Sequence, residues 1–139
     1  MKPSVLVDTG PLVAILSKRD SQHDRCVAEL DRLPAPLCTC WPVLTEALWL
    51  LRRDARTTQA LLKSFEAGFL RLLDLDQNSL EWIAGFLARY QDAGAQLADA
   101  ALVYLAERHG IESVFTLDHR HFSIYRLGRN RRLRVIPEP

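Results

Sequence analysis

Four carboxylates lie within or directly after apolar segments of this 139-residue chain, where charged side chains are rare. Asp8 follows residues 5–7, Glu46 lies within 41–51, Asp99 lies within 97–103, and Asp118 follows 114–117. These segments contain no lysine or arginine. Burying a carboxylate costs several kcal/mol unless a cation or a hydrogen-bond donor compensates its charge. We therefore expect the four side chains to be buried and to converge on a bound cation.

Carboxylate oxygens favour Mg²⁺ or Mn²⁺ over zinc. Four carboxylates close together repel one another strongly when no counter-charge is present. A Mg²⁺ ion held by a few carboxylates keeps water ligands, lowers the pKa of a bound water and stabilises charge on a phosphate. The acidic set therefore fits hydrolysis of a phosphodiester.

Each acid also has a structural interpretation when it is taken alone. Asp8 is a suitable N-cap for a helix that follows a strand, and Asp118 is a suitable turn residue. Asp99 is favoured in the first turn of a helix by the helix dipole. Glu46 is the hardest to explain structurally, because it falls in the middle of an apolar helical segment. The sequence leaves these alternatives open for each residue.

Short apolar runs alternate with helical periodicity along the chain. We expect strands at residues 4–8, 36–40, 70–75, 113–117 and 133–136, and helices at 11–17, 21–33, 41–53, 57–68, 76–90 and 97–109. The expected helix starts are a capping box of Ser21 with Asp24, then Thr57 or Thr58, then Asp76, and Gly110 should end the sixth helix. This alternation predicts a three-layer α/β/α sandwich with a central, mainly parallel sheet, in which residues 1–139 form one domain.

The expected fold would bring the four acids together. In open α/β sheets, ligands bind at the carboxyl ends of the strands. Asp8 and Asp118 lie at such ends, while Glu46 and Asp99 lie near the starts of helices that begin at the same edge. All four side chains can then face one cleft.

Global charge gives no indication of a nucleic-acid partner, because the formal net charge is +1. Residues 120–134 nevertheless carry no acid and six arginines: Arg120, Arg126, Arg129, Arg131, Arg132 and Arg134. This strip is either a solvated edge or a surface that contacts phosphates.

Cysteine usage and hydropathy indicate the compartment. The three cysteines, Cys26, Cys38 and Cys40, are too few and too irregular for a disulfide framework, and we expect them to be small buried hydrophobes in a reducing cytoplasm. No apolar stretch approaches the roughly 18 residues that span a membrane, and the N-terminal run is too short for a signal peptide.

Four short motifs give the chain a resemblance to the PIN-domain ribonucleases, and within them to the VapC-type toxins of bacterial toxin–antitoxin pairs. In chain order they are VDTGPL (7–12), LTEA (44–47), LADAALVYLA (97–106) and FTLDHRHF (115–122). The third motif is the most specific, and the order and spacing of all four strengthen the resemblance, which covers nearly the whole chain.

The resemblance implies Mg²⁺- or Mn²⁺-dependent endonucleolytic cleavage of RNA. Asp8 and Asp99 would be the principal metal ligands, and Glu46 and Asp118 would complete the pocket directly or through waters. The remaining implied positions are Thr9 and Thr116, which would hold a water or a carboxylate, and Asp92, which would act from outside the metal's immediate shell. The arginine-rich tail departs from the family in degree. Its arginines would strengthen RNA binding or else keep an edge strand soluble, and the candidates for RNA binding are Arg120, Arg126, Arg129, Arg131 and Arg132.

The resemblance also implies a homodimer and a cognate antitoxin that occupies the cleft. Trp41, Trp49 and Trp82 are candidates for such surfaces, although we expect at least two of them in the core. His119 and His121 flank Asp118 and would contact phosphate or base, or else neither.

Three other functions compete with the toxin. A housekeeping RNA-processing nuclease would have the same active site, and a catalytically silent PIN-fold binding module would lack acids that are present here. A phosphoryl-accepting receiver domain needs paired acids after its first strand and a late lysine. Asp8 is instead followed by Thr9 and Gly10, and no lysine follows Lys63.

Overall fold

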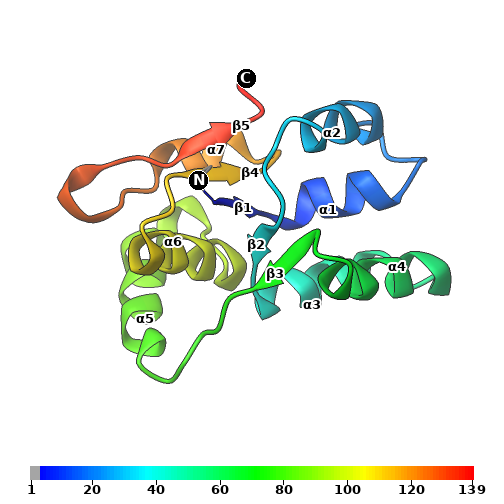
Figure 1. Cartoon of the computed structure of the whole chain (residues 1–139). Coiled ribbons are helices and arrows are strands. Elements are labelled where there is room, and N and C mark those ends of the chain that lie inside the picture. The colour runs from blue at the N-terminus through cyan, green and yellow to red at the C-terminus, as the bar shows by residue number, and fades with distance from the viewer. Residues whose placement is uncertain (1–3) are drawn as a thin grey trace.

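A computed structural model, which describes residues 4–139, contains a single five-stranded parallel sheet (Figure 1). Its strand order is β3-β2-β1-β4-β5, and every neighbouring pair is parallel. The strands are β1 (Val5–Val7), β2 (Leu37–Thr39), β3 (Leu70–Leu72), β4 (Ser113–Phe115) and β5 (Arg134–Ile136). All five expected strands are present, each shorter than its apolar run.

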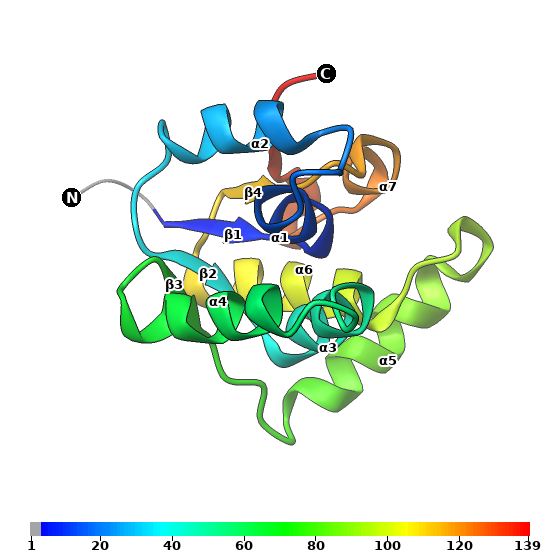
Figure 2. The same ribbon diagram turned by 90° about the vertical axis from the view of Figure 1, so that its right-hand side faces the viewer.

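Helices cover both sides of this sheet. They are α1 (Thr9–Leu16), α2 (His23–Leu30), α3 (Trp41–Leu50), α4 (Ala55–Glu66), α5 (Ser79–Arg89), α6 (Leu97–His109) and α7 (His119–Ile124), with short 3₁₀ turns η1 (Gln91–Ala93) and η2 (Gly128–Asn130). Figures 1 and 2 show α5 and α6 on one side and α1, α2 and α4 on the other. This arrangement confirms the expected α/β/α sandwich. Within residues 4–139, no helix has the length and apolarity to cross a bilayer.

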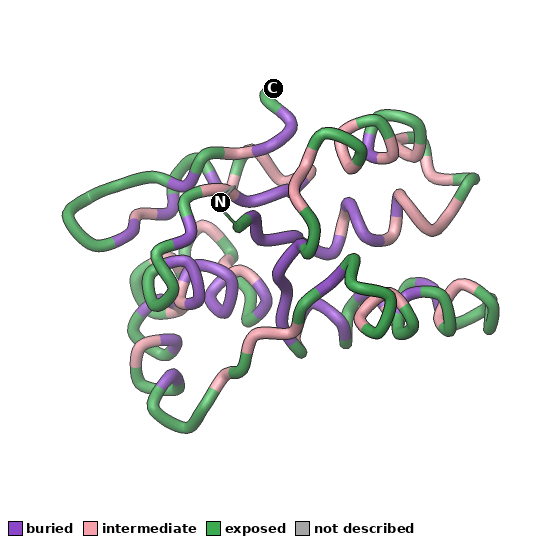
Figure 3. The backbone as a smooth tube through the Cα atoms, viewed as in Figure 1, coloured by how far each residue is buried: buried purple, intermediate pink, exposed green. Residues whose placement is uncertain are grey.

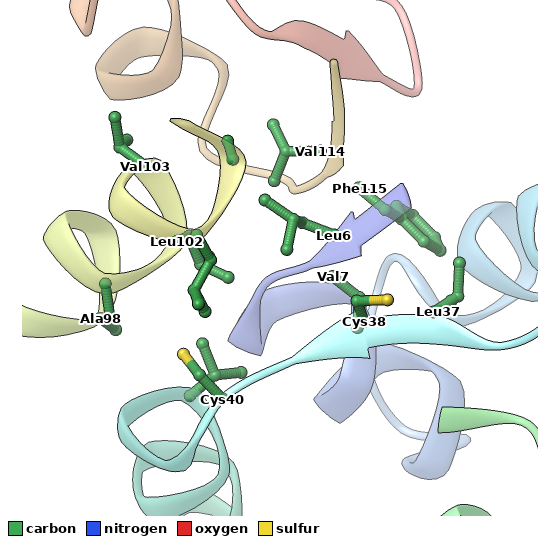
Figure 4. Packing of buried hydrophobic residues seen from close by; sticks show 14 of the residues in the cluster. Leu6, Val7, Leu37, Cys38, Cys40, Ala98, Leu102, Val103, Val114 and Phe115 are labelled. Carbon is green, nitrogen blue, oxygen red and sulfur yellow. The ribbon is translucent and has the colours of Figure 1, made fainter. Parts of the chain in front are cut away.

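The core is centred on β1, which is the central strand, and on its neighbour β4. Leu6, Val7, Val114 and Phe115 are fully buried. Figure 4 shows Leu6 and Val114 on the side of Leu102 of α6 and Phe115 pointing away from it. Burying an aliphatic or aromatic side chain of this size contributes about 1.5–3 kcal/mol relative to exposing it. Figure 3 shows the buried backbone concentrated in these strands and in α6. The three cysteines are free and buried, as expected.

The sixth helix has the limits expected from the sequence. It runs from Leu97 to His109 and ends at Gly110, whose φ of 66° is in the left-handed region that glycine adopts without a steric penalty. Because α6 is apolar on most sides, it is a buried helix. Asp99 lies in its first turn.

Two of the expected helix starts are wrong, and a third is displaced. Asp54 rather than Thr57 or Thr58 caps α4, because it lies one residue before the helix and accepts from the N–H groups of Arg56 and Thr57 at 2.9 and 3.4 Å.

Ser21 and Asp24 form no capping box, because α2 begins at His23 after Gln22, which makes no capping bond through its side chain. Asp76 accepts from Ser79 N–H at 3.2 Å, although Asn78 is the residue directly before α5. Helix α7 was not expected, because six residues are too few to show helical periodicity.

The expectation that at least two tryptophans lie in the core is also wrong. Trp41 and Trp49 are 58% and 63% exposed, and only Trp82 packs partly against the core. The reason is helical geometry: α3 buries Val43 and Ala47, and residues 41 and 49 lie on the opposite face.

The Asp54 cap gives a direct test of these helix limits. Asp54→Ala should lower the free energy of unfolding by about 1 kcal/mol, because the N–H groups of Arg56 and Thr57 lose their shared acceptor. Thr58→Ala should change it by less than about 0.5 kcal/mol. Urea denaturation of both variants measures the difference, and a larger loss for Thr58→Ala would show that the helix starts later.

Candidate active site

The four acids identified in the sequence line one cavity at the carboxyl edge of the sheet, with a volume of about 470 Å³. Asp8 follows β1, Asp118 follows β4, Glu46 comes from α3 and Asp99 comes from α6. None of the described lining residues is a lysine or an arginine. The lining residues are Asp8, Thr9, Gly10, Glu46, Leu50, Gly94, Gln96, Asp99, Leu117, Asp118 and His121.

The expectation that all four carboxylates are buried holds for Asp8 alone, which is 9% exposed. Asp99 and Asp118 are half-buried, and Glu46 is exposed. The cavity is open to solvent, so water reaches Asp99, Asp118 and Glu46 more easily than Asp8. Glu46 lies in an apolar sequence segment, but it projects from the outward face of α3.

Three of the acids lie at helix N-termini, where unpaired N–H groups and the helix dipole favour negative charge. Asp8 caps α1 and accepts from Thr9 N–H at 2.8 Å, and Asp118 caps α7 and accepts from His121 N–H at 3.2 Å. Asp99 forms a capping box at the start of α6. Their structural roles as caps therefore coexist with their position in the cavity.

Hydroxyl groups orient three of the carboxylates. Thr116 donates to Asp8 Oδ2 at 2.8 Å, and Thr9 donates to Glu46 Oε2 at 3.2 Å. These are bonds of the kind that the resemblance implied for the two threonines.

The third hydroxyl was not indicated by the sequence. Tyr125 donates to Asp99 Oδ2 at 2.7 Å, from a side chain that is 2% exposed. Burial, and then the hydrogen bond to Asp99, raise the pKa of this phenol, so it remains a donor at neutral pH. Each of the three bonds restricts the directions in which a carboxylate can point.

Asp8 carries the clearest electrostatic signature of the site. Burial raises the pKa of its carboxyl from 3.8 to about 6, against the lowering effect of the Thr9 N–H and the Thr116 hydroxyl. The negative charges of Asp99 and Glu46 raise this pKa further. A cation in the cavity would oppose both effects, because it would stabilise the ionised form.

His121 is the one titratable base among the described residues that line the cavity. Its Nδ1 lies 2.8 Å from Asp118 Oδ2, and its Nε2 lies 2.7 Å from the carbonyl oxygen of Ala93. Both nitrogens face acceptors, so both can donate only when the ring is an imidazolium. The bond to Asp118, and then the bond to Ala93, raise the pKa of His121 accordingly. His119 instead bonds the carbonyl oxygen of Pro137 at 2.7 Å, away from the cavity.

The remaining predicted site residues do not line the cavity. Asp92 is exposed in η1, on the turn that also carries Ala93. Arg120 is exposed on α7, and Arg126 donates to the carbonyl oxygens of Ser123 and Tyr125. The roles proposed for these residues stay predictions.

The arginines of residues 129–132 lie farther along the chain, on the exposed loop that enters β5. The strands are parallel and the acids follow their carboxyl ends, so this loop lies at the opposite edge of the sheet (Figure 1). Gly128 N–H donates to Glu107, near the end of α6 that is remote from Asp99. The RNA-binding role of Arg129, Arg131 and Arg132 is therefore also a prediction.

The cavity fits a hard divalent cation by its chemistry. It offers carboxylate oxygens from four side chains, and burial together with the neighbouring charges of Asp99 and Glu46 raises the pKa of Asp8, a shift that a cation would oppose. Within residues 4–139, no three His, Cys, Asp or Glu side chains form a ready-made ligand cage. Magnesium tolerates such a site, because it binds through one or two carboxylates and keeps several waters.

Comparison with known proteins identifies the family. The PIN domain family matches residues 5–127, a span that contains all four acids. Ribonuclease VapC26 of Mycobacterium tuberculosis is 30% identical over 135 residues, which cover 96% of this chain and 100% of that protein.

Two solved structures share the fold. The crystal structure of Mycobacterium tuberculosis VapC20, described as a Sarcin-Ricin loop cleaving toxin, superposes with a TM-score of 0.72 at 21% identity, over 80% of this chain and 87% of that one. The DNA-bound VapBC structure from Salmonella typhimurium superposes with a TM-score of 0.59 at 17% identity, over 96% of this chain and 97% of that one. With the family match, these likenesses confirm the resemblance, and the chain belongs to the PIN-domain family, as a VapC-type ribonuclease.

Proposed function

We propose that this protein is a Mg²⁺- or Mn²⁺-dependent endoribonuclease that acts as the toxin of a toxin–antitoxin pair. The observation that supports this proposal most strongly is the convergence of Asp8, Glu46, Asp99 and Asp118 on one cavity. The similarity to Ribonuclease VapC26 over nearly the whole chain supports RNA as the substrate.

Asp8 and Asp99 would hold the metal, with Glu46 and Asp118 completing the pocket directly or through waters. When bound, the ion activates a water and stabilises charge on the scissile phosphate. Thr116 and Tyr125 orient the two principal ligands through bonds of 2.8 and 2.7 Å.

His121 has a separate role in this proposal. As an imidazolium it holds Asp118 in place and carries positive charge at the edge of the cavity. Because Asp118 is already paired with this cation, we propose that it acts through water rather than as a direct ligand.

The partners follow from the same proposal. The VapBC structure among the fold relatives supports an antitoxin as a partner, and the family likeness supports a homodimer. The three free cysteines fit a reducing compartment, and we propose that the protein acts in the cytoplasm. An antitoxin gene beside this one would favour the toxin over a housekeeping nuclease.

Asp99→Asn tests the assignment of the site. We expect it to reduce cleavage of total cellular RNA in Mg²⁺ by more than about 100-fold, which exceeds the 10- to 100-fold loss typical of residues that only support a metal ligand. Asp74→Asn removes the same charge from an exposed position outside the cavity and should leave cleavage unchanged. EDTA should abolish cleavage by the wild type. Equal, metal-dependent cleavage by Asp99→Asn would contradict the assignment.

Asp8→Asn tests whether the acidic cluster lowers stability when no metal is bound. The pKa of Asp8 is raised to about 6 in the folded protein, so the folded state favours the protonated carboxyl. The free energy of unfolding therefore falls as pH rises from about 4 to about 6 and this group ionises. In EDTA at pH 7 the variant should therefore be more stable than the wild type by an amount on the order of 1–3 kcal/mol. Below pH 4 this difference should disappear.

Urea denaturation at both pH values, with and without Mg²⁺, measures the effect. Mg²⁺ should stabilise the wild type more than the variant. A variant that is less stable than the wild type at pH 7 in EDTA would show that Asp8 is primarily a structural cap.

Tyr125→Phe tests the hydroxyl that orients Asp99. The change removes one donor and keeps the ring within its aromatic cluster, so we expect about a tenfold fall in kcat or in the apparent metal affinity. KM for RNA should stay near the wild-type value, because the phenol is not on the open cavity wall. A Mg²⁺ titration of the cleavage rate separates these effects, and an unchanged titration curve and rate would show that this bond is dispensable.

A further inference from the structure

An acidic cavity alone is a poor binding site for RNA. It carries four carboxylates, and His121 is paired with one of them. RNA is a polyanion, and most of the affinity of proteins for nucleic acids comes from lysine and arginine contacts with phosphates. Positive charge must therefore lie beside the cavity rather than within it.

A second, larger cavity of about 1190 Å³ adjoins the first, and Leu50 lines both. We call it the basic groove. It lies where the end of α1 meets the turn between α3 and α4, on the side of the molecule that faces the viewer in Figure 2. Its lining residues are Leu16, Ser17, Lys18, Arg19, Leu50, Leu51, Arg53, Asp54, Ala55, Arg56 and Thr57.

The basic groove has four cations and one acid. Lys18 and Arg19 come from the α1 side, while Arg53 and Arg56 come from the α3–α4 side. All four are exposed, and among the described residues none of them forms a salt bridge. Asp54 is the only acid among these lining residues, so its single negative charge cannot offset four positive charges. The positive charge therefore remains available to a ligand.

The arginine-rich loop is less well placed for this role. It enters β5 at the edge of the sheet opposite the acids (Figure 1), and its arginines line neither cavity. The basic groove, by contrast, shares the lining residue Leu50 with the acidic cavity. A strand bound in the groove can reach the four carboxylates without crossing the sheet.

We propose that the basic groove binds backbone phosphates of single-stranded RNA that flank the bond to be cleaved. This inference rests on the proposed nuclease function and assigns its RNA-binding surface. An acidic polypeptide has charge of the same sign, but the position of the groove beside the cavity that holds the four acids favours RNA.

Salt-dependent binding tests the groove directly. The probe is a fluorescein-labelled uridine oligonucleotide of about 15 nucleotides, a length suited to a single-strand binding site, and its anisotropy is followed in EDTA over a range of salt concentrations. The variants are Lys18→Gln/Arg19→Gln on one wall and Arg53→Gln/Arg56→Gln on the other. Each double variant should lose two phosphate contacts. The slope of log affinity against log salt concentration should then become less steep by about 1.4.

The controls remove the same charge elsewhere. Lys63→Gln/Arg71→Gln changes two exposed cations outside both cavities and should leave the slope at its wild-type value. Arg131→Gln/Arg132→Gln compares the arginine-rich loop with the groove. A larger change for the loop pair than for either groove pair would overturn the proposal. So would groove variants that lose affinity for poly-glutamate but not for RNA.

Parallel cleavage assays in Mg²⁺ separate this inference from the function on which it rests. One outcome is that the wild type cleaves RNA while the groove variants bind RNA as well as the Lys63→Gln/Arg71→Gln control does. That result would refute the RNA-binding role of the groove but not the nuclease function. A wild type that neither binds nor cleaves RNA would refute both. Reduced cleavage by the groove variants that returns at high RNA concentration would support the groove, because the catalytic carboxylates are unchanged.

Discussion

The repulsion between carboxylates at one edge of the sheet is the constraint on which the rest of the site depends. The fold creates it, because parallel strands end and their helices begin at that edge. Helix N-termini hold Asp8, Asp99 and Asp118, and hydroxyl groups orient Asp8, Glu46 and Asp99. Burial raises the pKa of Asp8 to about 6, and the negative charges of Asp99 and Glu46 raise it further. A divalent cation in the cavity would stabilise the ionised carboxylates and so offset both effects.

Negative and positive side chains are separated around this pocket, and the separation fits a site that binds both a metal ion and RNA. The cavity wall holds the acids, whereas Lys18, Arg19, Arg53 and Arg56 lie in the adjoining groove. Keeping the two apart lets carboxylates face a metal without forming ion pairs with neighbouring cations. His121 is the exception, and its pairing with Asp118 distinguishes that carboxylate from the other three. If the two proposals are right, substitutions in the cavity and in the groove should alter metal binding and RNA binding separately.

Much of the fold and the acidic set could be predicted from the sequence, because both depend on local patterns. Short apolar runs marked all five strands, and Gly110 marked the end of α6 with the correct limit. The acids stood out because they interrupt apolar segments. The parallel topology predicted that the acids share one edge of the sheet. Thr9 and Thr116 lie within the motifs that contain Asp8 and Asp118. The exposure of Glu46 was not predictable in this way, since its apolar neighbours face other directions around α3.

The other features depend on contacts between distant residues or on very short elements. Tyr125 reaches Asp99 from 26 positions away, and no local pattern indicates that contact. His121 pairs with Asp118 only because α7 forms. The most direct test of the central claim is anomalous diffraction from crystals soaked in Mn²⁺. We expect a peak within coordination distance of Asp8 and Asp99. Mn²⁺ bound only elsewhere on the protein would contradict a metal site in this cavity.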